Sequence, residues 1–239
     1  MSETAPRIQT GQIYAQLRAE ILAGGFDPAQ PISQIKLAER LGVSRTPLRE
    51  ALRMLERDGL IASEPNRRVH VTALSIADLE QLYASRIVVE ALALRITLPR
   101  LEAGEIDGLR VAIDEMHTAA ASRDVERWEA PHRRYHDILR SHAGDRIVKL
   151  ADDLSAHGER YRRVYLNEPI AWSSAEAEHR AILDACRTRD VRLAAERLSR
   201  HLARTALTVI ASVAPEHDAS PVRTAVRMVA GTADTKEEP

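Results

Sequence analysis

Residues 34–58 constrain the fold of this chain most, because they place two helical patterns on either side of a glycine turn. Gly42 suits the left-handed backbone that ends a helix, and Ser44 suits the N-cap of the next one. Apolar residues recur at helical spacing in both segments: Ile35, Leu37 and Leu41 in the first, and Leu48, Leu52 and Leu55 in the second. The sequence therefore predicts two short helices joined by a tight turn.

A basic stripe follows the second of these helices at every fourth residue: Arg45, Arg49, Arg53 and Arg57. A helix with one apolar face and one arginine face suits the major groove of DNA, where guanidinium groups bond phosphate or guanine. The alternative is a solvated face on which Glu50 and Glu56 neutralise Arg53 and Arg57. The preceding helix, the glycine turn and the serine cap favour DNA binding.

Composition indicates a helical, globular protein of one or two domains. The chain has 239 residues, with 44% hydrophobic and only 3% aromatic residues, which favours helices over a sandwich or barrel. The single cysteine, Cys186, excludes an intramolecular disulfide and indicates a small core residue in a reducing compartment. No apolar run approaches the ~20 residues of a membrane span, and the N-terminus lacks the pattern of a signal peptide. We therefore expect a cytoplasmic protein.

Charge is distributed unevenly although the net charge is only −1. Residues 1–74 hold 10 Lys+Arg against 8 Asp+Glu, whereas the remainder holds 24 against 27. Six of these ten basic side chains lie on the arginine helix and on the segment around Arg67 and Arg68. This pattern suits a module that reads a DNA sequence better than a general nucleic-acid coat.

The chain divides into four parts by pattern. Residues 1–10 are expected to be a flexible arm, and residues 11–74 a winged helix-turn-helix with a first helix over 13–23 and two wing strands near 61–62 and 69–71. Residues 75–214 predict six helices that form a bundle, with Ser75 as the first cap. Residues 215–239 are expected to be a disordered tail, within which 220–229 forms at most a transient helix. The predicted fold class is mostly α.

The stretch LAERLGVSRTPLREAL at residues 37–52 resembles the GntR-type winged helix-turn-helix of bacterial transcription regulators. The resemblance extends from about residue 13 to residue 71, with Ala29 and Arg68 at positions where the family often has glycine. It implies double-stranded operator DNA as a partner. The residues that we expect to contact DNA are Lys36, Ser44, Arg45, Thr46, Arg49, Arg67 and Arg68.

Four histidines stand at suggestive places in the second part. His132 and His136 lie one helical turn apart and share a helix face, while His179 and His201 fall on two later helices. Facing helices of a bundle can direct such residues at one interior point, where neutral imidazoles suit zinc, nickel, copper or iron. From spacing alone, solvated or core histidines remain the more common explanation.

A second resemblance concerns the same segment. YHDILRSHAG at 135–144, EHRAILDA at 178–185 and His201 resemble the all-helical ligand-binding domain of the FadR branch, called FCD. Many members hold a metal with one Asp and three His, which implies His136, His179 and His201 as ligands here. His132 stands where the family usually has aspartate, so we expect four imidazoles to bind one zinc or nickel ion per chain.

The same resemblance places Arg86 at a position that faces the effector in several relatives. A guanidinium group there would grip a carboxylate in bidentate fashion. The alternative is a salt bridge between Arg86 and Glu90, one helical turn further on. Tyr161 and Tyr165 line either the pocket or the core, and we favour the core.

Three functions compete. The leading hypothesis is a homodimeric, metabolite-responsive transcription regulator, expected to be a repressor, which binds a small carboxylate over the metal and is not an enzyme. The second is a di-iron enzyme, since Glu129 and Glu176 each precede a histidine by three residues, although two further glutamates are needed. The third is a helical adaptor for a protein partner, which leaves the arginines and histidines without a role.

Overall fold

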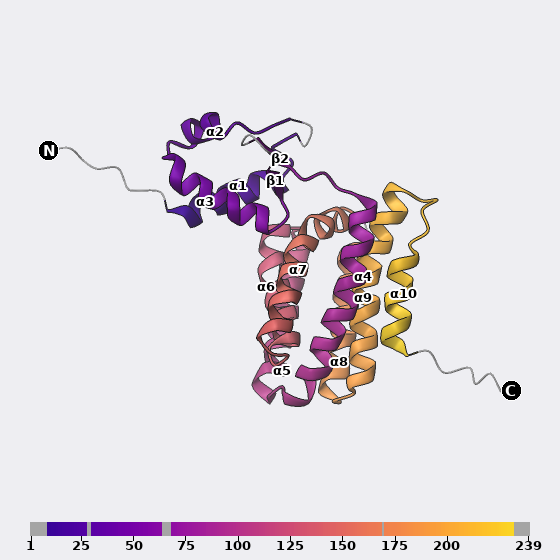
Figure 1. Ribbon diagram of the computed structural model, residues 1–239. Helices are drawn as coiled ribbons and strands as arrows, with labels where there is room; N and C mark the ends of the chain where they lie inside the picture. Colours follow the sequence, from indigo (N-terminus) through magenta and orange to yellow (C-terminus); the bar gives the residue numbers. More distant parts are fainter. Residues whose placement is uncertain (1–8, 28–29, 64–67, 169, 232–239) are drawn as a thin grey trace. The chain divides into compact units, whose positions relative to one another are not determined.

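The computed structural model describes residues 9–27, 30–63, 68–168 and 170–231, and forms two compact units, Met1–Leu74 and Ser75–Pro239 (Figure 1). The first unit contains α1 (Thr10–Leu22), α2 (Gln34–Leu41), α3 (Arg45–Arg57), β1 (Ile61–Ser63) and β2 (Val69–Val71). The second contains α4 (Ile76–Thr97), the 3-10 turn η1 (Leu98–Arg100), α5 (Ala103–Ala121), α6 (Val125–Arg140), α7 (Asp145–Leu166), α8 (Ala171–Arg187), α9 (Val191–Val213) and α10 (Ser220–Ala230). The mostly α fold is confirmed.

The first unit is a winged helix-turn-helix. Gly42 ends α2 with φ of 63°, a backbone conformation that suits glycine, and Ser33 caps the start of α2 by accepting a bond from the backbone N–H of Lys36 at 3.4 Å. Ser44 occupies the N-cap of α3, but its hydroxyl makes no capping bond. One expectation was wrong, because Ile35 is 56% exposed and α2 instead buries Leu37 and Ala38.

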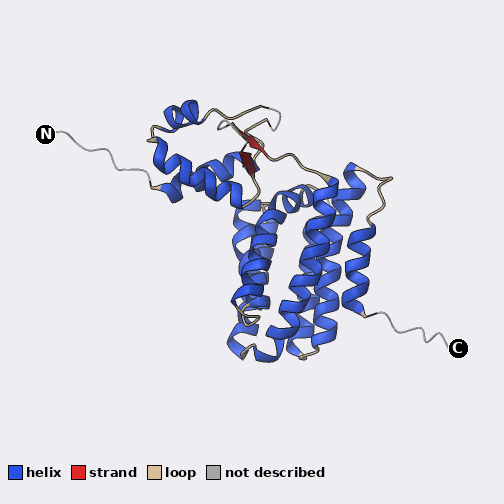
Figure 2. Ribbon diagram, in the orientation of Figure 1, coloured by secondary structure: helices blue, strands red, loops and turns tan. Residues whose placement is uncertain are grey.

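The wing is an antiparallel pair in which Ile61 lies opposite Val71 and Ser63 opposite Val69 (Figure 2). Ile32 forms an isolated bridge to Val69, which ties the segment before α2 to the wing. Most of the proposed arm, residues 1–8, lies outside the described residues, and α1 begins already at Thr10.

The second unit is a helical bundle in which α4–α9 are the six helices expected from the sequence. Ser75 caps α4 by accepting a bond from the backbone N–H of Asp78 at 3.3 Å. The hydroxyl of Tyr161 on α7 donates to Asp78 at 2.6 Å and accepts from the backbone N–H of Ser75 at 3.3 Å. The start of α4 is therefore fixed to α7.

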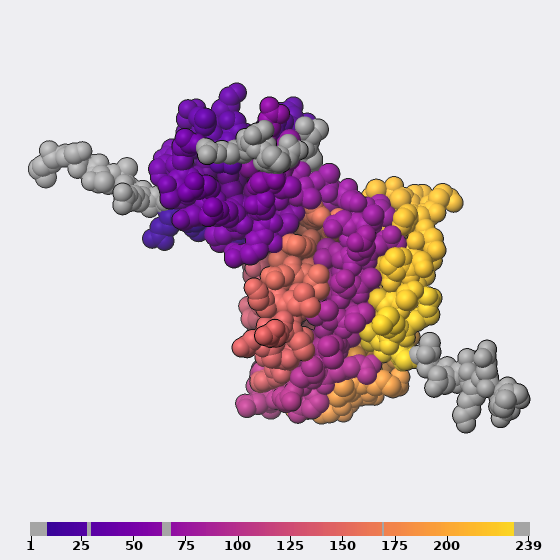
Figure 3. Space-filling model, viewed as in Figure 1, coloured from indigo at the N-terminus to yellow at the C-terminus, as the bar shows by residue number. Residues whose placement is uncertain are grey.

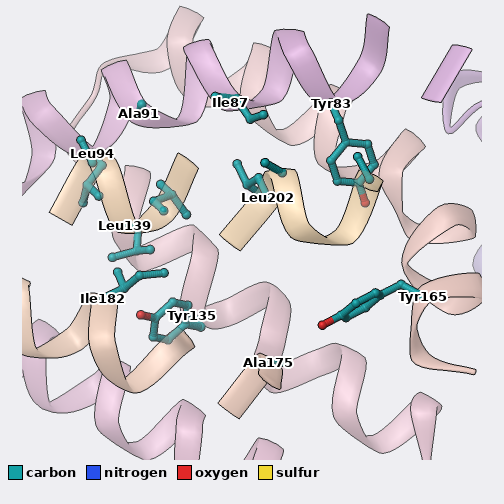
Figure 4. Close-up of a cluster of buried hydrophobic side chains, with 14 of the residues drawn as sticks. Tyr83, Ile87, Ala91, Leu94, Tyr135, Leu139, Tyr165, Ala175, Ile182 and Leu202 are labelled. Atoms are coloured by element: carbon teal, nitrogen blue, oxygen red, sulfur yellow. The ribbon is translucent and has the colours of Figure 1, made fainter. Parts of the chain in front are cut away.

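The core of the bundle is built from side chains of most of its helices (Figure 4). Tyr83 and Ile87 reach it from α4, Tyr135 from α6 and Ile182 from α8. Cys186 is a buried free thiol, as expected, and burial raises its pKa to about 12. Within the described residues, no helix combines the length and the apolar character that crossing a bilayer requires.

The C-terminal segment differs from expectation, because α10 is a packed helix and not part of a disordered tail. Val222, Ala225 and Val229 are buried, and α10 lies alongside α4, as its yellow surface beside α4 shows in Figure 3. The guanidinium of Arg95 also donates to the carbonyl of Val229 at 2.7 Å. A short helix with one apolar stripe is stabilised mainly by such tertiary packing. The remaining tail, 232–239, lies outside the described residues.

Candidate functional site

The basic face of α3 is exposed and largely without partners inside the protein. Within the described part of the chain, Arg45, Arg49 and Arg53 form neither an ion pair nor a hydrogen bond. The two acidic residues expected to neutralise the stripe are engaged elsewhere, since Glu50 accepts from the hydroxyl of Thr10 at 3.2 Å and Glu56 from the backbone N–H of Ser63 at 3.0 Å. The stripe is therefore available to an anionic partner such as DNA.

The other residues expected to contact DNA are also at the surface where they are described. Lys36 on α2 and Thr46 on α3 are exposed, and Ser44 lies exposed at the turn between the two helices. Arg68 is exposed immediately before β2, whereas Arg67 lies outside the described residues. The structure thus brings Ser44, Arg45, Thr46 and Arg49 together at the start of α3.

The four histidines converge inside the helical bundle. His132 and His136 come from α6, His179 from α8 and His201 from α9, and all four are between 1% and 5% exposed. One nitrogen of each ring lies within 4.8 Å of the corresponding nitrogens of the other three. Four helical positions that are distant in the sequence therefore present a compact set of nitrogen donors.

Hydrogen bonds from the outer nitrogens fix how two of the rings are oriented. Nδ1–H of His179 donates to the carbonyl of Ala175 at 2.6 Å, and Nδ1–H of His201 donates to Glu178 at 2.9 Å. With Nδ1 engaged in this way, Nε2 is the nitrogen of each ring that remains for the cluster. Partners of this kind set the tautomer of metal-binding histidines.

A buried acid stands behind the third ring. Oε2 of Glu90 lies 3.3 Å from Nδ1 of His136, and Oε1 of Glu90 accepts a bond from Nε of Arg86 at 2.9 Å. Burial alone would raise the pKa of Glu90, but Arg86 and His136 hold that pKa well below its usual range. Glu90 is therefore a carboxylate, and its negative charge orients His136.

The fourth ring is held by stacking. The ring of His132 lies against Trp128 with the centroids 4.3 Å apart and the planes 22° from parallel. Trp128 precedes His132 by one helical turn on α6, so the helix itself places the indole behind the imidazole. The spacing of Trp128 and His132, one helical turn, is visible in the sequence, but no role for Trp128 was inferred from it.

Burial keeps His132, His136 and His179 neutral, and each of these three rings has a nitrogen without a hydrogen-bond partner among the described residues. Burial holds the pKa of His132 and that of His179 well below 6.5, and lowers the pKa of His136 to about 4. Nδ1 of His132 and Nε2 of both His136 and His179 are buried without a hydrogen bond to any residue that the structure describes. Unpartnered buried nitrogens are unfavourable unless something binds them, and neutral imidazoles are the ligands that zinc and nickel accept. The residues present therefore fit a divalent metal ion.

Arg86 adopts the salt bridge that was the alternative to a role in effector binding. It is 1% exposed, its Nε pairs with Glu90, and its guanidinium carbon lies 4.9 Å from the centre of the Tyr83 ring. On the other side it packs against Gly158 of α7. Tyr161 and Tyr165 are buried in the bundle, as expected for core residues.

The sequence reasoning did not single out Tyr83 and Arg162 as functional residues. Both are buried, and the hydroxyl of Tyr83 and Nη1 of Arg162 have no hydrogen-bond partner among the described residues. No local spacing links them, because Tyr83 lies on α4 and Arg162 on α7.

The carboxylates that a di-iron site would need are occupied by other partners. Glu129 forms a buried salt bridge with Arg162. Glu176 pairs with His117 at 2.8 Å and with Arg180 at 3.0 Å near the surface. The donor set among the described residues is therefore four imidazoles and not a pair of bridging carboxylates.

Comparison with known proteins agrees with this division into two units. The family of bacterial regulatory proteins called gntR matches residues 9–71, and the FCD domain matches residues 81–204, which is more than half of the 239 residues. The HTH-type transcriptional regulator YdhC of Bacillus subtilis is 30% identical over 142 residues, which cover 58% of this chain and 62% of that protein. The match thus spans less than two thirds of YdhC.

Two further relatives cover more of their own length. The HTH-type transcriptional repressor GlaR of Escherichia coli is 23% identical over 198 residues, which cover 79% of this chain and 90% of GlaR. The solved structure of E. coli McbR/YncC has a TM-score of 0.70 with 19% identity and covers 85% of this chain and 97% of that one. At this identity the structural likeness shows the fold alone.

A winged helix-turn-helix joined to a helical bundle defines a DNA-binding transcription regulator and not an enzyme. The chain belongs to the GntR family of bacterial regulatory proteins, and its second unit is an FCD domain.

Proposed function

We propose that this protein is a metabolite-responsive repressor of the FadR branch, in which the FCD domain holds one divalent metal ion and a small carboxylate effector. The observation that carries the proposal is the convergence of four buried imidazoles, whose nitrogens lie within 4.8 Å of one another and include three without partners. Nothing in the core packing of an apolar bundle requires such a set. A ligand that binds to these nitrogens and changes the affinity of the protein for DNA would explain why the four histidines converge.

The DNA-binding part of the proposal rests on α3. A homodimer would place two such helices on the halves of an approximate palindrome, as two-fold symmetry requires. Arg45 and Arg49, which have no partner among the described residues, would contact bases or phosphates. Ser44 and Thr46 would add contacts to the DNA backbone, and Lys36, Arg67 and Arg68 would contact phosphate.

The metal would be held by His132, His136, His179 and His201. When bound, a zinc or nickel ion would supply a Lewis-acidic position for a carboxylate oxygen. Glu178, Glu90 and the carbonyl of Ala175 support the proposed ligands through their outer nitrogens. We propose that Arg86 binds the effector carboxylate while its Nε remains paired with Glu90. The repressor assignment is supported by the name of the relative GlaR.

The test begins with DNA. Fragments of the genome that encodes the protein are selected by the purified regulator, and the bound promoters are sequenced. Operator affinity is then measured at fixed salt with and without zinc and small carboxylates, while light scattering gives the oligomeric state.

We expect a palindromic site, a dimer, and a weaker complex when metal and carboxylate are both present. By linkage, the operator should weaken carboxylate binding by the same factor. No selected sequence, or an operator affinity that no carboxylate changes in the metal-loaded protein, would refute the proposal.

A further inference from the structure

The four imidazoles of the histidine cluster lie deep inside the bundle, so a metal ion needs a route to reach them. The rings are between 1% and 5% exposed. An ion cannot pass through a closely packed apolar interior, because such an interior has no space for it and does not solvate its charge. The route must therefore follow a line along which side chains can open locally.

A narrow cavity extends from the surface toward this cluster between α5, α6 and α8. Its lining includes both the buried ring of His179 and the exposed side chain of His117. Its volume is about 10 Å³, which is room for one water molecule at most. A hydrated divalent ion is larger than this, so the cavity admits it only when lining side chains move.

Regular helix spacing places most of the lining on facing sides of two helices. Trp172 and Glu176 precede His179 on α8 at helical spacing, so the three side chains share one face. Met116 and His117 contribute from α5, which packs against α8. The face of α8 that supplies a proposed metal ligand therefore also supplies the side chains between that ligand and the solvent.

The outer end of the cavity is closed by an ion pair between α5 and α8. Nδ1 of His117 lies 2.8 Å from Oε2 of Glu176. Arg180 donates to Oε1 of the same carboxylate at 3.1 Å and keeps it in place. The side chain of His117 is 62% exposed, and ion pairs at the surface are weak, so this closure opens readily.

The inner end is closed by two indole rings. Trp172 meets Trp128 edge to face, with the ring centroids 6.0 Å apart and the planes at 81°. Trp128 in turn stacks on His132, and its ring centroid lies 6.4 Å from that of His179. Trp128 is 4% exposed, whereas Trp172 is only half-buried, so Trp172 is the ring that can turn outwards. That movement would widen the cavity next to the histidines.

We propose that this cavity is the entry route of the metal ion, with the pair of His117 and Glu176 as its outer closure and Trp172 as its inner closure. The inference rests on the proposed function, in which the four histidines hold the ion. Brief opening then sets the rates of metal uptake and release. Because neither closure touches the ion, loosening one should raise both rates by the same factor and leave the affinity unchanged.

The test uses full-length protein and follows the route in two ways. Trp128 and Trp172 are the only tryptophans of the chain, so a Trp172→Phe protein reports Trp128 alone. Quenching of its emission by acrylamide measures opening in the metal-free protein, and stopped-flow absorbance measures the rate of Co²⁺ uptake. His117→Ala is added to this background to remove the outer closure. His142→Ala is the matched control, because His142 forms a similar surface pair with Glu105 at 2.9 Å and does not line the cavity.

We expect His117→Ala to raise both the quenching of Trp128 and the rate of Co²⁺ uptake roughly twofold to fivefold, as the loss of a surface ion pair allows. Its affinity for Co²⁺ should stay unchanged. His142→Ala should alter neither quantity. Alanine in place of phenylalanine at residue 172 should raise both further, because it leaves the space of the ring open.

Failure of the route and failure of the proposed function give different results. A wild-type protein that takes up no Co²⁺ overturns the proposed metal site and the route with it. A wild type that takes up Co²⁺, together with equal uptake rates in all the variants, overturns the route alone, whatever the quenching shows.

Discussion

Gly158 on α7 provides the space that the guanidinium group of Arg86 occupies. A Cβ atom at residue 158 would lie 2.6 Å from Nη1 of Arg86 and 3.3 Å from its Cζ, both closer than normal contact. Arg86 has little freedom to move away, because it is buried and its Nε pairs with Glu90 at 2.9 Å. The absence of one side chain on α7 thus permits a buried ion pair beside the histidine cluster.

Gly158→Ala should destabilise the protein. Alanine favours the helix by up to about 1 kcal/mol over glycine, but crowding in a packed interior costs roughly 1–3 kcal/mol, and the buried pair strengthens that cost. Urea unfolding of the metal-free protein measures the difference. Gly104→Ala is the control, since a Cβ there meets nothing within 4 Å and should leave stability equal or higher. Equal stability of both variants would contradict the prediction.

Arg45→Ala and Arg49→Ala should each weaken operator binding by roughly 1–3 kcal/mol if the side chain grips guanine. A side chain that contacts only phosphate would instead weaken all sequences alike and reduce the salt dependence. Binding isotherms at several salt concentrations separate the two cases. Arg110→Ala on α5, which removes an exposed arginine paired with Asp107 and Asp114, should leave operator affinity unchanged. The same affinity in all three variants would rule out this face of α3.

His179→Ala and His201→Ala should remove the metal and the response to carboxylate while basal DNA binding persists. Each substitution deletes one nitrogen of the four, and the remaining three no longer surround the ion. Elemental analysis of protein purified without a His-tag, with melting before and after chelation, gives the answer. His117→Ala, an exposed histidine paired with Glu176, is the control. A wild type that holds no metal and gains no stability from zinc, nickel or manganese would make the four histidines structural.

Metal-free protein should lose stability as the pH falls below about 6.5. In the unfolded chain these histidines titrate near ~6.5, whereas burial lowers the pKa of His136 in the folded protein to about 4. Between those values the unfolded chain binds more protons, so the free energy of unfolding falls with pH. The slope is roughly 1.4 kcal/mol per pH unit for each such histidine, and above pH ~6.5 this contribution is constant.

The same shift bears on metal binding, because a free imidazole exchanges a metal for a proton near pH ~6.5. Protons compete with the metal at His136 only as the pH approaches about 4, so at this ring metal binding should tolerate a lower pH than a free imidazole would allow. Urea unfolding and metal titration across this range measure both effects. His136→Phe should flatten the stability profile, whereas an unchanged profile would show that the ring does not titrate in this window.

His132→Asp should keep a metal but change which one binds best. The substitution restores the residue that the resemblance to FCD domains implies, adds a negative charge and replaces a nitrogen with an oxygen donor. Harder ions such as manganese should gain affinity relative to nickel. Loss of the stacking between His132 and Trp128 should also change the tryptophan fluorescence. Competition titrations with both metals measure the order, and an unchanged order would mean that residue 132 is not a ligand.

The sequence revealed most of the fold because its signals are local. Gly42, Ser75 and the apolar repeats define helix ends and faces that the structure reproduces. The convergence of the histidines was suggested by their helix positions and by a family resemblance. The pairing of Arg162 with Glu129 and the isolation of Tyr83 were not predictable, because they depend on how α4, α6 and α7 pack against one another.

The short helix α10 was also missed, for a related reason. Its apolar stripe of Val222, Ala225 and Val229 is too short to indicate a stable helix by itself. The helix becomes stable only on the surface that α4 and α9 provide, and that surface is assembled from segments far away in the sequence.

The position of α10 matters for the design of truncated fragments of this protein. The FCD match ends at residue 204, yet α10 covers apolar surface of α4 and α9 and belongs to the same core. A fragment cut at the family boundary, or just after Val213, would uncover that surface to water. Self-association of such a fragment would then be an artefact of the cut, easily mistaken for the native dimer. The C-terminal cut belongs beyond Gly231.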